Sequence, residues 1–360
     1  MNELEAAIAG TVDPSCGITL VVSGTRIRAV QAEAKVAVTL SLGYPLSADA
    51  QAMLRDAVAA TLGDSGCQLA SFELASRIVA HAVQPNLAPL TRVRNVIAIG
   101  SGKGGVGKST TAVNLALALA ADGARVGVLD ADIYGPSVPM MLGLSGRPDS
   151  PDGKSIEPMR AHGIQAMSIG LLVEIDTPMI WRGPMATSAL TQLLGETLWG
   201  EPGVPLDYLI VDLPPGTGDI QLTLAQKIPV AGAVIVTTPQ DVALLDARKA
   251  LNMFGKVHVP VLGLIENMAV HVCSQCGHAE HLFGQGGGER MAAQYQLPLL
   301  GSLPLELGIR EQGDAGVPVV KAAPDSTAAQ AYRHTARRMA AVLAGRPRAG
   351  MPIEASLLQG

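Results

Sequence analysis

The chain has 360 residues, of which 48% are hydrophobic and 3% aromatic, and its formal net charge is −5. This length accommodates two ordinary domains, or one large domain with an appendage. The acidic balance argues against nucleic-acid binding, and the scarcity of aromatic side chains argues against a platform on which single-stranded nucleic acid stacks.

The sequence favours a cytoplasmic protein without a membrane partner. Its longest apolar runs, such as residues 112–121, fall short of the roughly 20 residues that a membrane span needs. The first five residues are acidic and lack the basic-then-apolar order of a signal peptide. The 4 cysteines are too few for a disulfide framework, so a close cysteine pair in a reducing compartment indicates metal binding or redox chemistry.

Residues 1–83 have the pattern of a small α+β domain. The pattern predicts two helices and three strands, at residues 4–8 and 48–61 for the helices and at residues 18–22, 27–32 and 36–42 for the strands. Residues 84–92 contain two prolines in a polar setting, which is typical of a linker.

Residues 93–345 alternate apolar strand runs with helical segments. The runs are continuous and β-branched, as in strands buried on both faces of a sheet; they cover residues 96–99, 126–130, 208–212, 233–237 and 261–267. This pattern predicts an α/β fold, a doubly wound and mainly parallel sheet, closed by a helix at residues 328–343. The tail, 346–360, holds a proline and an acid after its two arginines, which argues against a membrane-binding helix.

A glycine-rich loop joins the first of these strands to a helical pattern at residues 109–121. Strand, loop and helix in this order are the context of a Walker A phosphate-binding motif. The glycines let backbone N–H groups approach phosphate oxygens, and the helix N-terminus adds partial positive charge. Lys108 is expected to reach the terminal phosphates and Ser109 to hold Mg²⁺. The predicted nucleotide-binding residues are Gly102, Lys103, Gly104, Gly105, Val106, Gly107, Lys108, Ser109 and Thr110.

Lys103 is a second lysine in this loop. It is either a solvated lysine or a cation that neutralises charge developing in the transition state. The loop resembles the deviant Walker A motif of the MinD/ParA/nitrogenase-iron-protein class. This resemblance implies a nucleotide-sandwich homodimer, in which Lys103 reaches the nucleotide of the opposite subunit and acts in catalysis together with Lys108.

Carboxylates stand at the ends of two predicted strands. Asp212 follows four apolar residues, as in a Walker B strand, and is expected in the Mg²⁺ shell. By similarity to the same class, the segment after Asp130 is switch I, and Asp132 is the catalytic residue that orients the attacking water. Asp130 is interpreted either as a structural residue or as a group that acts on Mg²⁺ through water. Residues 213–219 combine two prolines with mobile glycines, which suits switch II.

Asn267 ends the strand at residues 261–267. In the same class an asparagine at this place contacts adenine, so the resemblance implies ATP as the nucleotide; alternatively, Asn267 caps a turn.

Cys273 and Cys276 form a C-x-x-C pair directly after that strand. The spacing lets two thiolates share a metal centre. Half of a zinc site, a redox dithiol and a purely structural pair are the other interpretations, and three nearby histidines, His271, His278 and His281, favour a metal. One pair supplies two ligands, whereas zinc or a [4Fe–4S] cluster takes four, so a symmetric dimer would complete the set. Cys16 and Cys67 are isolated and are interpreted as buried small hydrophobic residues.

These motifs together resemble the Mrp/ApbC iron–sulfur cluster carriers, a branch of the MinD/ParA class. The resemblance spans residues 93 to about 320 and rests on the phosphate loop, Asp130–Ser137, Trp181–Met185, Asp207–Asp219, and Glu266–Met268 leading into the cysteine pair. Residues 1–83 are similar to the small domain often fused to such carriers, without the reactive cysteine that one version of that domain carries.

The family resemblance implies an ATP hydrolase that carries an iron–sulfur cluster. ATP, Mg²⁺ and a [4Fe–4S] cluster bridging two subunits would be its cofactors, and apo iron–sulfur client proteins and a cluster-assembly scaffold its partners. Two alternatives are a MinD/ParA-like spatial-regulation ATPase and a zinc-stabilised P-loop ATPase.

Overall fold

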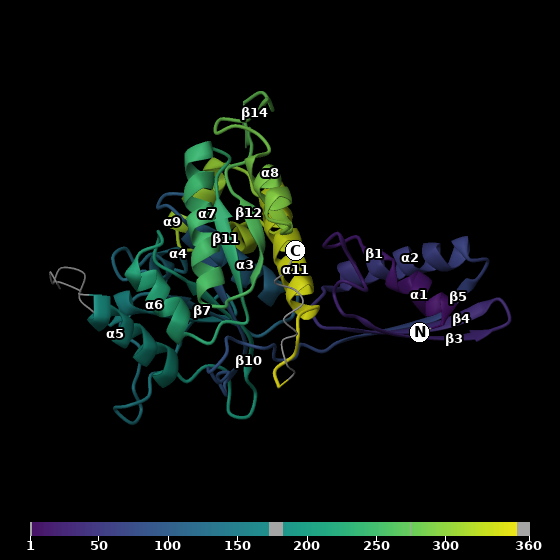
Figure 1. Cartoon of the computed structure of the whole chain (residues 1–360), viewed down its shortest axis with the longest axis horizontal. Helices are drawn as coiled ribbons and strands as arrows, with labels where there is room; N and C mark the ends of the chain where they lie inside the picture. Colours follow the sequence, from purple (N-terminus) through teal and green to yellow (C-terminus); the bar gives the residue numbers. More distant parts are fainter. Residues whose placement is uncertain (1, 173–182, 274, 351–360) are drawn as a thin grey trace.

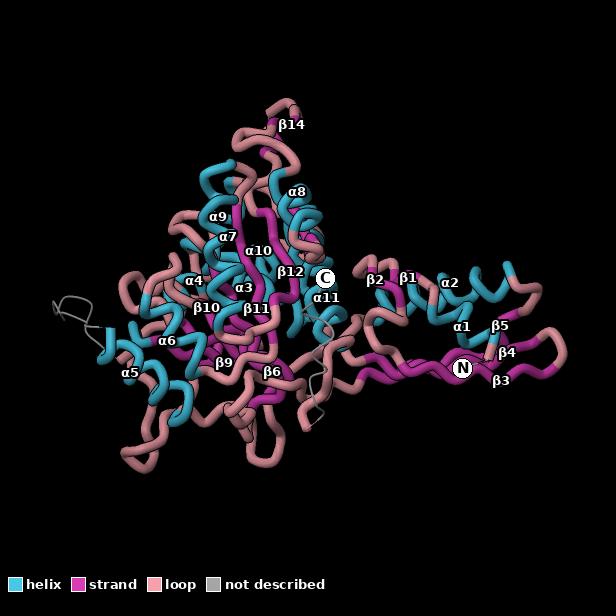
Figure 2. Tube along the Cα trace, in the orientation of Figure 1, coloured by secondary structure: helices cyan, strands magenta, loops and turns pink. Residues whose placement is uncertain are grey.

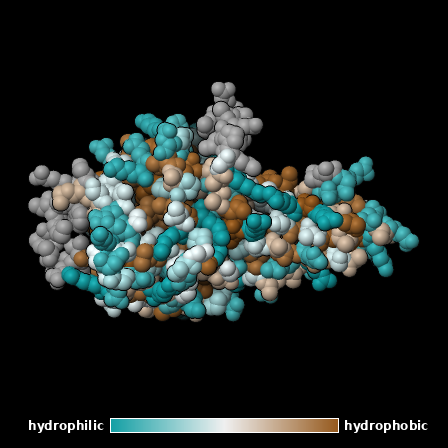
Figure 3. Space-filling view, turned by 90° about the horizontal axis from the view of Figure 1, so that it is seen from below, coloured by the Kyte–Doolittle hydropathy of each residue, from teal (hydrophilic) through white to brown (hydrophobic). Residues whose placement is uncertain are grey.

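The computed structural model describes residues 2–172, 183–273 and 275–350. A larger unit is built on a central sheet with helices on both sides, and a smaller unit extends from one side of it (Figure 1). In the space-filling view the surface of the smaller unit runs on into that of the larger one (Figure 3).

The central sheet has eight strands in the order β15-β12-β11-β6-β10-β7-β9-β8. Every neighbouring pair is parallel except β8 and β9. The chain leaves the first strand, β6, in both directions, which confirms the predicted doubly wound, mainly parallel sheet. The strands are β6 (Val93–Gly100), β7 (Val126–Asp130), β8 (Met159–Ala161), β9 (Ile164–Ser168), β10 (Leu206–Asp212), β11 (Gly232–Thr237), β12 (Val261–Glu266) and β15 (Leu299–Ser302).

Side chains of β6 alternate between two apolar clusters, one on each face of the sheet. Ile97 and Ile99 pack in the cluster that contains α3 and α11, whereas Val96 and Ala98 pack with α5, α6, α7 and α8. Because both faces are buried, the strand sequences are continuously apolar.

The helices of the larger unit connect these strands, and no helix in the described part of the chain is long and apolar enough to cross a bilayer. They are α3 (Lys108–Ala121), α4 (Val138–Met141), α5 (Gly183–Glu196), α6 (Asp219–Lys227), α7 (Asp241–Lys256), α8 (Gly287–Gln294), α9 (Leu307–Asp314), α10 (Val319–Ala322) and α11 (Thr327–Ala344), with a short 3₁₀ turn, η1 (Ile169–Leu171).

The smaller unit packs two helices, α1 (Glu3–Ala9) and α2 (Ala48–Asp64), against a three-stranded sheet in the order β3-β4-β5 (Figure 2). Its strands are β1 (Val12–Asp13), β2 (Ile18–Thr19), β3 (Arg26–Ala32), β4 (Lys35–Leu42) and β5 (Gln68–Ser76). The strand expected at residues 18–22 has only two residues, and β5 was not expected. A register shift at Val36/Ala37 offsets the pairing of β4 with β5, so the side-chain alternation that reveals a strand is interrupted in β5.

Helix α11 joins the two units. Arg337 of this helix donates hydrogen bonds to Asp122, at the C-terminal end of α3, and to Ser47, which precedes α2. Residues 80–82 also pair with residues 347–349. Gln84 is buried and donates to the carbonyl groups of Ala225 and Ile228, so the segment expected as a linker is anchored to the larger unit.

Candidate nucleotide-binding site and cysteine hairpin

The phosphate loop runs from the end of β6 to the start of α3, at the point of the sheet where the strand order reverses. At two positions of the loop, neighbouring atoms lie so close to the backbone that only glycine fits. A Cβ atom at Gly102 would lie 2.0 Å from the carbonyl group of Asp246, and one at Gly107, where φ is +79°, would lie 2.2 Å from Nδ2 of Asn267. The loop therefore packs directly against α7 and the end of β12.

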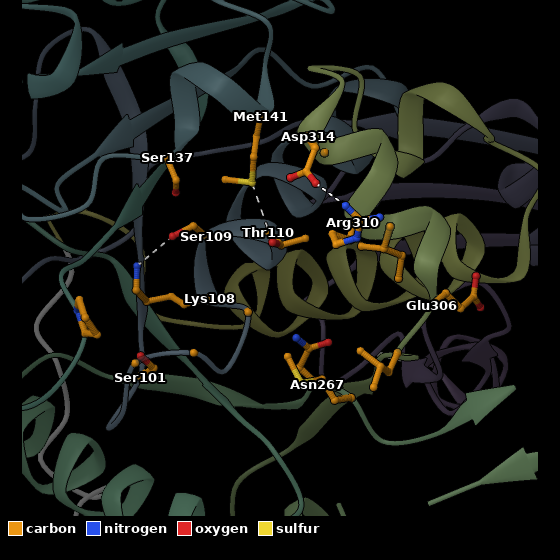
Figure 4. A pocket seen from close by; sticks show the side chains of 18 of the residues that line it. Ser101, Lys108, Ser109, Thr110, Ser137, Met141, Asn267, Glu306, Arg310 and Asp314 are labelled. Atoms are coloured by element: carbon orange, nitrogen blue, oxygen red, sulfur yellow. Dashed lines mark hydrogen bonds and ion pairs between the residues drawn. The ribbon is translucent and has the colours of Figure 1, made fainter. Parts of the chain in front are cut away.

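A cavity of about 430 Å³ opens beside this loop. Its walls comprise the loop itself, the two segments predicted as switches, the residues after β12, and residues 304–314. Figure 4 shows Lys108 and Ser109 on one side of the cavity and Glu306 and Arg310 on the other. With Tyr332 of α11, the structure brings together residues from six separate stretches of the chain.

Lys108 and Asp212 form a buried ion pair, with 2.5 Å between Nζ and Oδ1. Burial raises the pKa of Asp212, and the Lys108 ammonium opposes this rise. The second oxygen, Oδ2, is buried and has no hydrogen-bond partner among the residues that the structure describes. An unpartnered carboxylate oxygen beside Ser109 fits a Mg²⁺ ligand, because Mg²⁺ takes oxygen ligands from one or two carboxylates together with phosphates.

Asp130 is fully buried and its two oxygens already have donors. Oδ2 accepts hydrogen bonds from the backbone N–H groups of Ser137 and Val138, at 3.0 and 3.1 Å, and from the Ser168 hydroxyl at 3.2 Å. Oδ1 accepts from the N–H of Asp132. Burial and the Asp212 charge raise the pKa of Asp130 to about 7. Asp130 thus anchors the predicted switch I segment, which agrees with its structural interpretation; its Mg²⁺ role stays a prediction.

Asp132 lines the cavity and is partly exposed. Its Oδ1 accepts only long hydrogen bonds, 3.3 and 3.4 Å, from the backbone N–H groups of Tyr134 and Gly135. Unlike Asp130, it retains capacity to accept a hydrogen bond from a water molecule in the cavity.

Lys103 is exposed, and its ammonium has no hydrogen bond or ion pair with any residue in the described part of the chain. Its carbonyl group accepts a hydrogen bond from the Ser101 hydroxyl at 3.0 Å, which holds the backbone of the loop.

Asn267 follows β12 and is buried against the phosphate loop, where its Nδ2 donates to the Val106 carbonyl at 2.9 Å.

The opposite wall of the cavity includes Glu306, Arg310 and Asp314, which were not predicted. Arg310 binds Asp314 at 2.7 Å. No motif marks these residues; only the apposition of α9 to the loop brings them to the cavity.

The cysteine pair lies in a hairpin formed by β13 (His271–Val272) and β14 (Ala279–Glu280), which projects from the body of the molecule (Figure 1). Cys273 is partly exposed and Cys276 is exposed. The backbone N–H groups of Cys276 and Gln275 lower the pKa of the Cys273 thiol, which favours the thiolate that binds metals.

The other two cysteines, Cys16 and Cys67, are buried in the smaller unit. Burial and the Asp13 charge raise the pKa of Cys16 to about 12, so this thiol stays protonated. Within the described residues, no group of three or more His, Cys, Asp and Glu side chains is arranged to hold a metal ion. The hairpin therefore presents two free thiol groups, from Cys273 and Cys276. Trp181 and Arg182 of the family pattern lie outside the described residues.

The chain matches known proteins over most of its length. The family model for the ParA-type NUBPL iron-transfer P-loop NTPase matches residues 92–340. The iron–sulfur cluster carrier protein of Haemophilus influenzae is 48% identical over 343 residues, which cover 95% of this chain and 92% of that protein. The iron–sulfur cluster transfer protein NUBPL of Mus musculus is 51% identical over 265 residues, or 73% of this chain and 82% of that protein.

Two solved structures share the fold of the larger unit. A nucleotide-binding protein from Archaeoglobus fulgidus in complex with ADP is 38% identical, with a TM-score of 0.55 over 62% of this chain and 87% of that chain. The Pyrococcus furiosus cell division ATPase MinD is 23% identical, with a TM-score of 0.52 over 68% of this chain and 98% of that chain, which shows the fold alone. The predicted resemblance is confirmed: the chain belongs to the ParA/NUBPL family of iron-transfer P-loop NTPases.

Proposed function

We propose that this protein is an ATP-dependent iron–sulfur cluster carrier. Two copies hold one [4Fe–4S] cluster between their Cys273 and Cys276 side chains and transfer it to apo-proteins after receiving it from an assembly scaffold. The observation that carries this proposal is the projecting hairpin with two accessible thiols, in a chain whose relatives are named iron–sulfur cluster carriers.

The number of ligands supports a dimer. A [4Fe–4S] cluster takes four thiolates, and two hairpins related by a two-fold axis supply four. The nearby His271 and His281 each use Nδ1 in a hydrogen bond to a backbone carbonyl group. The lowered pKa of Cys273, caused by the N–H groups of Cys276 and Gln275, favours the thiolate form that binds iron.

The surface around the phosphate loop also supports a second copy of the chain. Val242 and Leu245 lie on α7, which touches the loop at Gly102, and these two side chains are 61% and 53% exposed. Tyr134, in the predicted switch I segment, is 64% exposed. A second subunit that covers these apolar groups would also meet the unpaired ammonium of Lys103.

When ATP binds, Lys108 and Asp212 would each leave their ion pair and take a new partner. The phosphates of ATP would take the Lys108 ammonium, and Asp212 and Ser109 would then hold Mg²⁺. When bound, Mg²⁺ would neutralise part of the phosphate charge. Asp132 orients the attacking water, and Lys103 of the opposite subunit adds a positive charge at the transferring phosphate.

Cluster transfer needs no change of oxidation state. A thiolate of the client protein displaces one carrier thiolate from iron at each step, so one Fe–S bond forms as another breaks. Because the four thiolate ligands come from two subunits, any change in dimer geometry on ATP hydrolysis changes their spacing. The strength with which they bind the cluster changes with it.

The test is anaerobic reconstitution of the purified protein with iron and sulfide, followed by absorption spectroscopy and iron analysis. We expect about four iron atoms per dimer in the wild type and almost none in the Cys273→Ala/Cys276→Ala protein. Cys67→Ala, which removes a buried thiol of the smaller unit, is the matched control and should retain the cluster. A double variant that keeps its cluster would refute the proposal.

Transfer is tested separately, by incubating the loaded protein with an apo-protein that needs a [4Fe–4S] cluster. Tight zinc binding without transfer would favour a zinc-stabilised ATPase instead. Cluster-independent recruitment to vesicles or DNA by ATP would favour a spatial-regulation ATPase.

A further inference from the structure

The cysteine hairpin and one wall of the nucleotide cavity are parts of one hydrogen-bonded structure. Asn267 and Met268 line the cavity, and only Ala269 and Val270 separate them from β13. On the other side, Pro304, Leu305 and Glu306 line the same cavity. The distance along the chain from the cavity to Cys273 is therefore very short.

Backbone hydrogen bonds join these two segments along their whole length. Leu303 N–H donates to the Glu266 carbonyl at 2.8 Å, Ala269 N–H donates to the Leu303 carbonyl at 3.0 Å, and Leu305 N–H donates to the Val270 carbonyl at 2.8 Å. This ladder extends the pairing of β12 with β15 as far as the start of the hairpin. A displacement of the cavity wall is thus carried to the base of the hairpin.

Two histidines tie both strands of the hairpin to this ladder. His271 Nδ1 is 2.9 Å from the Leu305 carbonyl oxygen, and His281 Nδ1 is 2.7 Å from the Ala269 carbonyl oxygen. Because a carbonyl oxygen only accepts, both Nδ1 atoms carry the proton. His278 is different: its side chain is 68% exposed, and its closest charged group is Glu280 at 3.8 Å.

At the cavity end, the Asn267 amide nitrogen carries two hydrogens that it can donate. Its Nδ2 donates to the Val106 carbonyl of the phosphate loop. A nucleotide base that accepts from the second N–H would therefore bind the same side chain that holds the phosphate loop. Met268, the next residue, has φ +56°, a left-handed conformation that costs energy for a side chain of this size. The strained backbone at Met268 thus lies directly between Asn267 and the hairpin.

We infer that occupation of the cavity by a nucleotide base changes the presentation of Cys273 and Cys276 through this ladder, with His271 and His281 as positioning residues. The inference rests on the proposed function in that it names how the cluster site is regulated. It places the control in the segment between Asn267 and Cys273 of the same subunit.

The experiment measures the rate at which iodoacetamide alkylates Cys273 and Cys276 in the full-length, cluster-free protein without oxygen, by mass spectrometry of the hairpin peptide. ADP with Mg²⁺ is the ligand, because ADP lacks the γ-phosphate that the proposed dimer contact of Lys103 requires. Pyrophosphate with Mg²⁺ is the control ligand, because it has the two phosphates of ADP without a base. Light scattering checks that the oligomeric state of the protein is the same in each sample.

We expect ADP to change the alkylation rate about fivefold in the wild type and pyrophosphate to leave it unchanged. His271→Ala should bind ADP with unchanged affinity by calorimetry and lose the rate change. His271→Asn, whose Nδ2 can donate to the Leu305 carbonyl in place of Nδ1, should restore it, and His278→Ala should behave as the wild type.

An unchanged rate with ADP in the wild type, or a full rate change in His271→Ala, would overturn the inference. Because alkylation needs no cluster, these outcomes are independent of reconstitution. A protein that fails to hold a cluster but keeps the ADP effect would refute the proposed function and leave the coupling in place.

Discussion

Lys108 of the phosphate loop and Asp212 at the end of β10 form an ion pair in which both side chains are buried, at 6% and 0% exposure. The pair joins the two motifs that act on the nucleotide, and each partner compensates the charge of the other. Removal of either one leaves a buried charge without a counter-ion, which is costly in a protein interior.

Lys108→Ala should therefore change both activity and stability. ATP hydrolysis, measured by phosphate release, should fall by about 10² to 10³-fold because the cation at the phosphates is lost. The free energy of unfolding without nucleotide, from urea denaturation, should fall by about 3 kcal/mol because Asp212 loses its partner. An unchanged unfolding midpoint would mean that the ion pair does not stabilise the fold.

Lys103→Ala is the matched control, since it removes a lysine five positions earlier in the same loop. Its ammonium is exposed and unpaired in the described part of the chain, so stability should change by less than about 0.5 kcal/mol. Under the proposed function hydrolysis should still fall, because Lys103 would add its charge at the nucleotide of a second subunit. If this activity also stays at the wild-type level, Lys103 is a solvated lysine.

Asp132→Ala should leave ATP binding intact and slow its hydrolysis by about 10²-fold, because it removes the proposed acceptor for the attacking water without disturbing a buried contact. Calorimetry measures the binding and single-turnover kinetics the hydrolysis. Asp152→Ala, which removes an exposed acid in the surface loop before β8, serves as the control. Normal turnover in Asp132→Ala would assign the water to another residue.

Arg337→Ala should destabilise the whole chain. Asp122 is buried and accepts hydrogen bonds from Arg337 and Arg333, and Arg337 alone also reaches Ser47 of the smaller unit. We expect a loss of about 3 kcal/mol in urea denaturation, because Arg333 compensates Asp122 only in part. Arg310→Ala, which breaks exposed ion pairs, should cost less than about 1 kcal/mol. Equal effects of the two substitutions would contradict this role.

The alkylation of Cys273 should depend on pH in a defined direction. Its pKa is lowered by the N–H groups of Cys276 and Gln275, so the reactive thiolate forms at lower pH than in an unfolded chain. The pH at half-maximal alkylation rate in the native protein should lie below that of the same cysteine in guanidinium chloride. Coincident pH profiles would show that the hairpin does not stabilise the thiolate.

Local sequence patterns predicted much of this fold. The strand, glycine-rich loop and helix around Lys108 are consecutive in the chain, so their periodicity and composition suffice to identify them. The strand β5 escaped prediction because its register shift against β4 interrupts the alternation of its side chains. The wall formed by Glu306, Arg310 and Asp314 escaped because α9 carries no motif.

The sequence by itself determined the phosphate loop and the cysteine pair, since each depends on residues within one short segment. Only the tertiary structure decided which distant groups meet them. Asp212 is 104 positions from Lys108, and Asn267 is 161 positions from Val106. The order of strands in the parallel sheet brings their carboxyl ends to one edge, and that order follows from packing across the whole domain, which no local pattern encodes.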